Sequence, residues 1–348
     1  MDIRFFRQDD VDAIVALWNE SVEAGEVVFR TADKAYWHEK IELDPNFTPD
    51  FTFVAEEEGK LVGFISGLCK KVMLNGETED NTPGYITCFF VQKDHRLKGI
   101  GRALVETLEN AFRTAGKKSI SCGGNPINLD WIIPGTPGHD HNNAPAMDEG
   151  CPGFPFLKAL GYQVTASEIA MYLDLSKYAP WDGFEAQREK LASEGVYVGR
   201  YDTDLDYDYD GMCDRVGSEY WREALRSEIA CHKENRPNTD IRFLPNGKVP
   251  KGPRPILVAT CDGHIVAQTG PIDLQESGRG FFTGICTDPL YERRGIASVL
   301  FNVLMQEFIA EGAKFSTLFT GDSNHAQRIY KRSGFNVVRR FSIMEKEL

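Results

Sequence analysis

The chain has 348 residues, 42% of them hydrophobic and 26% charged, and its formal net charge is −13. This length exceeds the roughly 100–200 residues typical of one domain, so we expect two domains, each with its own core. The acidic balance argues against nucleic acid as a general partner, because contacts to phosphates need clustered Lys and Arg. No apolar run reaches the length of a membrane helix and the N-terminus lacks the apolar core of a signal peptide, so we expect a cytoplasmic protein with no membrane partner.

The eight cysteines are scattered singly, mostly inside apolar segments, and none forms a C-x-x-C pair. This pattern indicates reduced, buried thiols rather than a disulfide framework or a zinc site. His139 and His141 flank Asp140, but metal binding would require further ligands from elsewhere in the chain. We therefore predict no metal.

In the first half of the chain we expect, in order, a strand, a helix, a β-hairpin, a strand and a helix. The helices are predicted from apolar residues at helical spacing, and the hairpin is predicted from two β-rich runs around a Glu-Gly-Lys turn. Gly116 is a stop signal for the second helix. The five expected elements lie at 2–7, 11–22, 51–69, 85–92 and 101–115.

The second half repeats this order at 196–202, 211–229, 256–272, 281–288 and 293–314. The spacing is constant: Gly295 lies 295 − 99 = 196 residues after Gly99, and Lys314 lies 314 − 118 = 196 residues after Lys118. Two copies of one β/α unit explain this constant spacing. The domains that we expect are 1–175 and 191–348, with a connector at 176–190.

The segment 96-RLKGIGR-102 joins the strand at 85–92 to the following helix. It is neither a P-loop nor a dinucleotide fingerprint, since a Gly-Lys-Ser/Thr ending is absent and Leu104 stands where a third glycine is needed. Without a Cβ at Gly99 and Gly101, backbone N–H groups can approach an anion closely, and the helix N-terminus adds partial positive charge. The alternative is that the first glycine only makes a tight turn. The basic residues that would strengthen a pyrophosphate site are Arg96, Lys98 and Arg102.

The second copy reads 291-YERRGIASVL-300 and keeps the basic residues, a glycine, a small residue and the helix. The two segments resemble the acetyl-CoA loop of the GNAT superfamily of N-acetyltransferases, written [QR]-x-x-G-x-[GA]. The positions matched in the first copy are Arg96, Gly99 and Gly101. In the second copy Gly295 and Ala297 match, but Glu292 stands at the first position.

The resemblance implies which residues contact acetyl-CoA, with no metal involved. In the first copy they are Val91, Arg96, Lys98, Gly99, Ile100, Gly101, Arg102 and Asn128. In the second copy they are Cys286, Thr287, Arg293, Arg294, Gly295, Ile296, Ala297, Ser298 and Asn324. A backbone N–H near Cys286 and Thr287 is the implied donor to the oxyanion of the reaction.

The segment 324-NHAQRIYKRSGF-335 resembles a second GNAT signature, although Ala326 stands one residue before the position of the alanine in that signature. It implies that Asn324 contacts the pantetheine arm and that Tyr330 lies near the thioester sulfur, where its phenol can protonate the departing thiolate. The alternative is that Tyr330 is only a core residue. Counting back from Gly161, the first copy has Leu157 at this position, after a Gly/Pro-rich insertion within 129–160.

The resemblance implies an α/β fold of two GNAT-like domains, each a mixed, mainly antiparallel sheet flanked by helices, in a tandem arrangement similar to that of the mycothiol synthases. It implies an acetyl-CoA-dependent N-acetyltransferase acting on a small amine, as a monomer or homodimer, with catalysis in the second copy. No general base stands out among the carboxylates. The candidates are Asp273, Glu276, Glu219 and Glu223.

Two other functions remain open. One is a non-catalytic acyl-CoA-binding sensor or scaffold. The other is transfer of a different acyl group, or of an aminoacyl group as in the peptidoglycan-bridge transferases, although these lack a CoA loop of this kind.

Overall fold

The computed structural model describes the chain except for residues 75, 128, 133–139, 142–145 and 245–248. The chain forms two compact units: Met1–Ala170 with Val338–Leu348, and Met171–Val337. Residues 338–348 therefore belong to the first unit although they end the chain. The domains expected at 1–175 and 191–348 follow the sequence repeat and stay a prediction.

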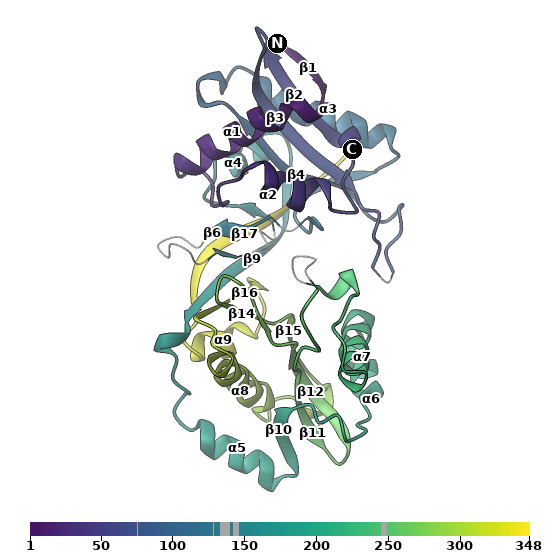
Figure 1. The fold of residues 1–348 in the computed structure, drawn as a ribbon, viewed down its shortest axis with the longest axis vertical. Helices are drawn as coiled ribbons and strands as arrows, with labels where there is room; N and C mark the ends of the chain where they lie inside the picture. Colours follow the sequence, from purple (N-terminus) through teal and green to yellow (C-terminus); the bar gives the residue numbers. More distant parts are fainter. Residues whose placement is uncertain (75, 128, 133–139, 142–145, 245–248) are drawn as a thin grey trace. The chain divides into compact units, whose positions relative to one another are not determined.

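The first unit is built on one sheet (Figure 1). Its strands, in their order across the sheet, are β1 (Asp2–Phe5), β2 (Thr52–Glu57), β3 (Lys60–Cys69), β4 (Gly84–Val91), β5 (Ser119–Cys122), β17 (Asn336–Glu347) and β9 (Gln163–Asp174). Strands β1 to β4 are antiparallel neighbours, β5 is parallel to β4, and β17 is antiparallel to β5. The short β8 (Met147–Asp148) also pairs with β17, and β6 (Trp131–Ile132) pairs with β7 (Asp140–His141).

Helices cover both faces of this sheet. Trp18 of α1 (Val11–Glu23) belongs to the same buried cluster as Phe64, and α2 (Lys34–Trp37) packs on that face as well. Phe112 of α3 (Ile100–Thr114) and Leu157 of α4 (Gly153–Ala159) belong to the opposite cluster, with Ile65. Since Phe64 and Ile65 are neighbours in β3 and successive strand side chains point to opposite faces, one strand supplies both cores.

One sheet of the second unit has four described strands. Its order is β10 (Val196–Arg200), β11 (Leu257–Cys261), β12 (His264–Gly270) and β15 (Gly284–Thr287), with all neighbours antiparallel. The other three strands, β16 (Phe315–Gly321), β14 (Arg279–Phe281) and β13 (Asp273–Leu274), are the last three in the order of the 11-stranded sheet that begins with β1, and β14 is parallel to β16.

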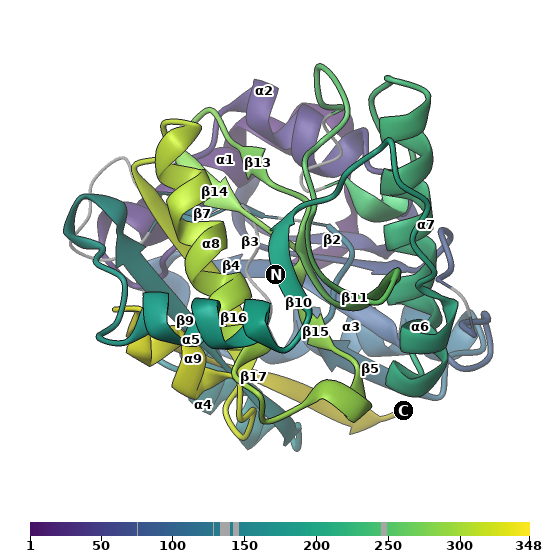
Figure 2. The same ribbon diagram turned by 90° about the horizontal axis from the view of Figure 1, so that it is seen from below.

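Five helices of the second unit have described bounds: α5 (Phe184–Ser193), α6 (Asp210–Val216), α7 (Glu219–Lys233), α8 (Ile296–Ala310) and α9 (Gln327–Arg332). Strands β10, β11 and β15 lie between α7 and α8 (Figure 2). Leu225 and Ile229 of α7 pack with Val258 and Ile265 of the sheet, whereas α8 contacts its other face. No described helix is long and apolar enough to cross a membrane.

The backbone repeats with the spacing seen in the sequence. The parallel pair Gly84–Ile120 of β4 and β5 recurs 196 residues later as Gly280–Ser316 of β14 and β16. Helices α3 and α8 begin at Ile100 and Ile296 and have 15 residues each. The prediction of two α/β copies, each with a mixed sheet flanked by helices, is confirmed.

Two expected elements differ in the structure, and the expected connector, which stays a prediction, is partly helical. The helix expected at 211–229 is broken at Gly217, which is left-handed (φ 71°), and Ser218 caps α7. The strand expected at 281–288 is two strands, because β14 pairs with β16 whereas β15 pairs with β12. The segment expected as a connector at 176–190 contains most of α5.

Candidate functional site

The loop between β4 and α3 is a cradle of backbone amides. Leu97 (φ 60°) and Gly99 (φ 88°) are both left-handed, and Gly99 is the N-cap of α3 without a side chain that could cap it. Ala103 donates its N–H to the Gly99 carbonyl (3.0 Å), but the N–H groups from Lys98 to Arg102 meet no acceptor within the described part of the chain. Unpaired amides at a helix N-terminus bind anions, so this loop fits a pyrophosphate.

Glycine at position 99 is required by conformation rather than by space. A Cβ built on Gly99 would meet no atom within 4 Å, so the space next to this residue is open. At Gly101 a Cβ would lie 3.1 Å from the Phe156 ring of α4, so this second glycine allows α4 to approach the loop. The two glycines of the motif therefore have different physical reasons.

The basic residues near this loop have unequal roles. Arg96 donates from Nε to the Val91 carbonyl (2.9 Å) and pairs with Glu26 (2.7 Å). The hydrogen bond from Arg96 to Glu26 is the main cause of the lowered pKa of Glu26. Arg96 thus braces the loop. Lys98 is exposed, and Arg102 makes only an exposed contact with Glu106 (3.8 Å), which contributes little.

The equivalent loop of the second unit has the same backbone. Arg293 (φ 58°) and Gly295 (φ 82°) are left-handed, and Val299 donates to the Gly295 carbonyl (3.1 Å). The N–H groups from Arg294 to Ser298, which include those of Ile296 and Ala297, find no acceptor among the residues that the structure describes. This second loop therefore also fits a pyrophosphate.

Helix α5 distinguishes the second loop from the first. Gln187 donates from Nε2 to the Arg294 carbonyl (2.8 Å), and its amide lies 3.0 Å from where a Cβ of Gly295 would be. The Arg294 guanidinium pairs with Glu194 (2.6 Å) just after α5. The first loop is held by Arg96, a residue of the loop motif itself, whereas the second loop is held by Gln187 of α5 and by Glu194 just after that helix.

Cys286 and Thr287 lie at the end of β15. Burial raises the pKa of the Cys286 thiol to about 12, so it stays protonated at neutral pH and is a poor nucleophile. The next residue, Asp288, is buried and accepts two hydrogen bonds from Arg215 (2.8 and 2.5 Å), which lower its pKa and hold α6 against the end of β15.

Tyr330 lies on α9 with 6% of its surface exposed, and its ring packs against Phe301 of α8 (centroids 5.0 Å apart). Burial raises the pKa of its phenol to about 12. The group is therefore a neutral hydrogen donor at physiological pH. Asn324 is exposed and accepts a hydrogen bond from the Ala326 N–H (2.9 Å) at the start of α9.

Leu157 occupies the corresponding backbone position in the first unit. Phe335 donates its N–H to the Tyr330 carbonyl (3.1 Å), and Tyr162 donates to the Leu157 carbonyl at the same distance (3.1 Å). The glycines that precede these donors, Gly334 and Gly161, have φ values of 93° and 92°. Asn128, the first-copy equivalent expected for Asn324, lies outside the described residues, as does His139.

A family model described as "Acetyltransferase (GNAT) family" matches residues 14–130 and again 218–335, and the two matches together cover more than half of the chain. The chain belongs to this family. Family members take the acetyl group from acetyl-CoA, so the two amide cradles fit the family's acyl donor.

Relatives agree with this assignment. An acetyltransferase of Pectobacterium atrosepticum is 31% identical over 119 residues, which are 33% of this chain and 70% of that protein. A GCN5-related N-acetyltransferase from Sphaerobacter thermophilus superposes with a TM-score of 0.61 at 15% identity, covering 99% of this chain and 95% of that one. A tandem GNAT protein from the clavulanic acid biosynthesis pathway gives 0.57 at 15% identity, covering 99% and 98%. At these identities the two structures show the fold alone.

In this GNAT protein the four carboxylates considered as general base have different surroundings. Asp273 is partly buried, and burial raises its pKa although Arg254 and Arg279 act against the rise. Glu219 pairs with Arg222 (3.1 Å), and Glu223 pairs with Arg242 (2.7 Å). Glu276 is exposed. The raised pKa of Asp273 suits a proton acceptor.

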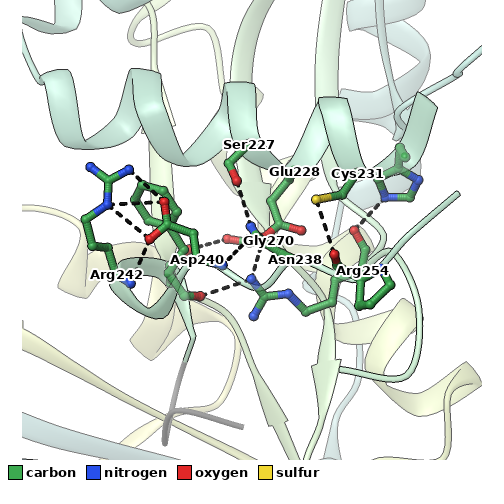
Figure 3. A network of polar contacts seen from close by, with 12 residues as sticks. Ser227, Glu228, Cys231, Asn238, Asp240, Arg242, Arg254 and Gly270 are labelled. Carbon is green, nitrogen blue, oxygen red and sulfur yellow. Dashed lines mark hydrogen bonds and ion pairs between the residues drawn. The ribbon is translucent and has the colours of Figure 1, made fainter. Parts of the chain in front are cut away.

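A buried polar network in the second GNAT unit was not expected from the sequence. Glu228 points from α7 toward Arg254, with Asn238 beside them (Figure 3). All three side chains are at most 4% exposed. The one sign of this network in the sequence is Glu228, a charged residue on the apolar face of its helix, between Leu225 and Ile229. Arg254 and Asn238 lie in irregular segments, where no periodicity marks them.

Proposed function

We propose that the protein is an acetyl-CoA-dependent N-acetyltransferase that acts on a small amine, with transfer in the second copy. The observation that carries the proposal is the difference between Tyr330 and Leu157 on equivalent backbones. Only the second copy has a proton donor at this position, whereas both copies have an amide cradle for the pyrophosphate.

In this proposal each residue of the second copy has a separate role in the reaction. The N–H groups from Arg294 to Ser298 would hold the pyrophosphate, with Asn324 near the pantetheine arm. A free alkylamine has a pKa of about 10 and must lose a proton before it attacks, and Asp273 is the proposed acceptor of that proton. The Tyr330 phenol would donate its proton to the departing thiolate. A backbone N–H near Cys286 and Thr287 would stabilise the oxyanion.

Replacing Tyr330 by Phe tests the assignment, since it removes one hydroxyl and keeps the ring that packs against Phe301. We expect kcat to fall by about 100-fold, the lower end for a general acid, with the KM for acetyl-CoA little changed. Because the pKa of Tyr330 is about 12, the wild-type rate should show no fall from loss of this proton up to pH 10. CoA release with a panel of amines is the measurement.

The matched variant is Leu157→Ala, at the equivalent position of the first unit. It should lower stability through a cavity but leave the rate per folded molecule near that of the wild type. Equal loss of activity in both variants, or loss only in Leu157→Ala, contradicts catalysis in the second copy.

The first copy favours a second role for its loop. With Leu157 in place of a donor, it would bind acetyl-CoA without transferring the acetyl group. If the whole protein is only such a sensor, acetyl-CoA will raise its melting temperature while no amine in the panel is consumed at any pH.

A further inference from the structure

Helix α5 lies beside the second cofactor loop but outside the residues that the family model matches. The second match covers residues 218–335, whereas α5 spans Phe184–Ser193. The helix packs on α8 and on β10 (Figure 1). A role of α5 at the loop therefore does not follow from the family motif.

Gln187 belongs to the buried face of α5. Phe184 precedes it by three residues and Leu191 follows it by four, and these two side chains are 2% and 1% exposed. Residues at such spacings share one face of a helix, so Gln187 is a polar residue in an apolar stripe. Its amide needs a hydrogen-bond partner there, because an unpaired amide in a packed interface loses its hydration without compensation.

The partner of Gln187 is the backbone of the loop. Its Nε2 donates to the Arg294 carbonyl (2.8 Å). In a trans peptide the N–H points opposite to the carbonyl, and the N–H of this peptide belongs to Gly295. Since the carbonyl points to α5, the Gly295 N–H points away from α5, and it is one of the unpaired amides of the cradle. Gln187 therefore fixes the direction of an amide that the proposed pyrophosphate site uses.

The same hydrogen bond supports a loop with an unfavourable backbone. Arg293 is left-handed (φ 58°), a conformation that is unfavourable for a residue with a Cβ. In the first unit the equivalent residue has this conformation too, and there Arg96 holds the loop by donating to the Val91 carbonyl (2.9 Å). Glu292 stands at the position of Arg96 in the second unit, and a carboxylate cannot donate to a carbonyl. Gln187 thus supplies from another helix the donor that the second motif lacks.

Both ends of α5 are held within the second unit. Before the helix, the Arg332 guanidinium of α9 lies over the Trp181 ring, 3.6 Å from its centroid. After the helix, Glu194 pairs with the Arg294 guanidinium (2.6 Å). The Gln187 amide is therefore held in place before a ligand binds, and such preorganisation lowers the entropic cost of binding.

The first loop has no equivalent of Gln187. No described residue donates to the Lys98 carbonyl, which corresponds to the Arg294 carbonyl. A Cβ on Gly99 would meet no atom within 4 Å, whereas one on Gly295 would lie 3.0 Å from the Gln187 amide. The two loops share a backbone but differ in their neighbours, so the first loop is a reference for the second within one molecule.

We propose that Gln187 is a positioning residue for acetyl-CoA, which orients the Gly295 N–H toward the pyrophosphate and makes the second site depend on α5. The inference rests on the proposed N-acetyltransferase function and deepens it. Gln187 acts through the peptide that joins Arg294 to Gly295. Its effect should therefore appear with ligands that carry a pyrophosphate and be absent with ligands that lack one.

The test replaces Gln187 by Met, which keeps a long side chain and removes the donor. Hydrogen exchange of the full chain, titrated with acetyl-CoA, reports separately on the loops at 292–300 and 96–104. We expect the acetyl-CoA concentration for half protection at 292–300 to rise about fivefold, the scale of one hydrogen bond, with no change at 96–104. In the CoA-release assay the KM for acetyl-CoA should rise by the same factor while kcat stays unchanged.

A second acyl donor distinguishes positioning from a general structural effect. S-acetylpantetheine keeps the thioester and the pantetheine arm but has no pyrophosphate, so its kcat/KM should be the same in Gln187→Met and in the wild type. Ala186→Met is the matched control, because Ala186 is exposed on the same helix and receives the same new side chain. This control should behave like the wild type with both donors.

The outcomes separate the two proposals. Weaker protection at 292–300 in Gln187→Met, in a protein that releases no CoA with any amine of the panel, supports the positioning role and contradicts the acetyltransferase proposal. Transfer by the wild type with an unchanged KM in Gln187→Met supports the acetyltransferase and overturns the positioning role. Equal weakening by Ala186→Met, an equal loss with S-acetylpantetheine, or absence of protection at 292–300 in the wild type also overturns it.

Discussion

At the scale of single residues, the glycines of the first loop explain what a short motif encodes. Gly99 is needed for its left-handed backbone and Gly101 for the approach of Phe156. A sequence pattern records both simply as glycine, so the two reasons could not be separated before the structure. The same holds for Arg96, which the motif marks as an anion contact and the structure places against Glu26 and the Val91 carbonyl.

Replacing Gly99 by Ala tests the loop without filling it, because a Cβ there meets no atom within 4 Å. We expect the left-handed backbone to cost about 1–2 kcal/mol of stability. Relaxation toward ordinary φ values would turn the amides away from the ligand and weaken acetyl-CoA binding at this site by about tenfold. Urea unfolding and calorimetric titration measure the two effects.

The control lies at the other end of the same helix. Gly116 is also left-handed (φ 82°), and a Cβ there also meets nothing within 4 Å. Gly116→Ala should therefore cost the same stability and leave acetyl-CoA binding unchanged. Equal weakening of binding by both variants would show that the loop amides are not the site.

At the scale of elements, the sequence predicted best what depends on local pattern. The helices expected at 101–115 and 293–314 correspond to α3 and α8, because apolar spacing and the flanking glycines determine both ends. The break between α6 and α7 was missed although Gly217-Ser218 is a stop followed by an N-cap. The division between β14 and β15 had no local signal, since it follows from pairing with two distant strands.

Docking of α3 and α8 on their sheets depends on a glycine in the strand below. A Cβ at Gly280 would lie 2.6 Å from the Phe308 ring, and one at Gly84 2.5 Å from the Phe112 ring. We expect Gly280→Ala to cost about 1–3 kcal/mol through overpacking. In the double variant with Phe308→Leu the loss should be smaller than the sum of the single losses, because the two residues are in contact.

Urea unfolding of the full cycle provides the measurement. Gly199 of β10 is the matched control, since it is also in a strand of the second unit and a Cβ there meets nothing within 4 Å. Gly199→Ala should be neutral or slightly stabilising. Additive losses in the Gly280 and Phe308 cycle would contradict steric docking.

At the scale of the whole molecule, the sequence shows the repeat, but it does not show to which compact unit the last strand, β17, belongs. The constant spacing of 196 residues identifies the copies, and counting through it would assign 336–347 to the second. Instead, residues 338–348 belong to the first unit. Strand partners are chosen by contacts far apart in sequence, and neither periodicity nor turn residues specify them.

Removing residues 338–348 should therefore destabilise the first unit, not the half of the sequence from which they come. The strand pairs Met344 with Cys122 and Glu347 with Ser119, and it sets the Phe341 ring on Trp131. Lys346 also pairs with the buried Glu109 (2.9 Å). Without these contacts β5 becomes an edge and Glu109 loses an ammonium partner, at a cost comparable to the roughly 5–15 kcal/mol stability of a domain.

Hydrogen exchange is the measurement, because it reports on each strand separately. We expect the amides of β4 and β5 to lose protection in the truncated chain, while those of β11 and β12 keep theirs. A chain that carries the same eleven residues in shuffled order is the control for length and charge, and it should behave like the truncation. Protection lost first in β11 and β12 would place the strand with the second unit, because exchange then follows the sequence repeat instead of the pairing of β17 with β5.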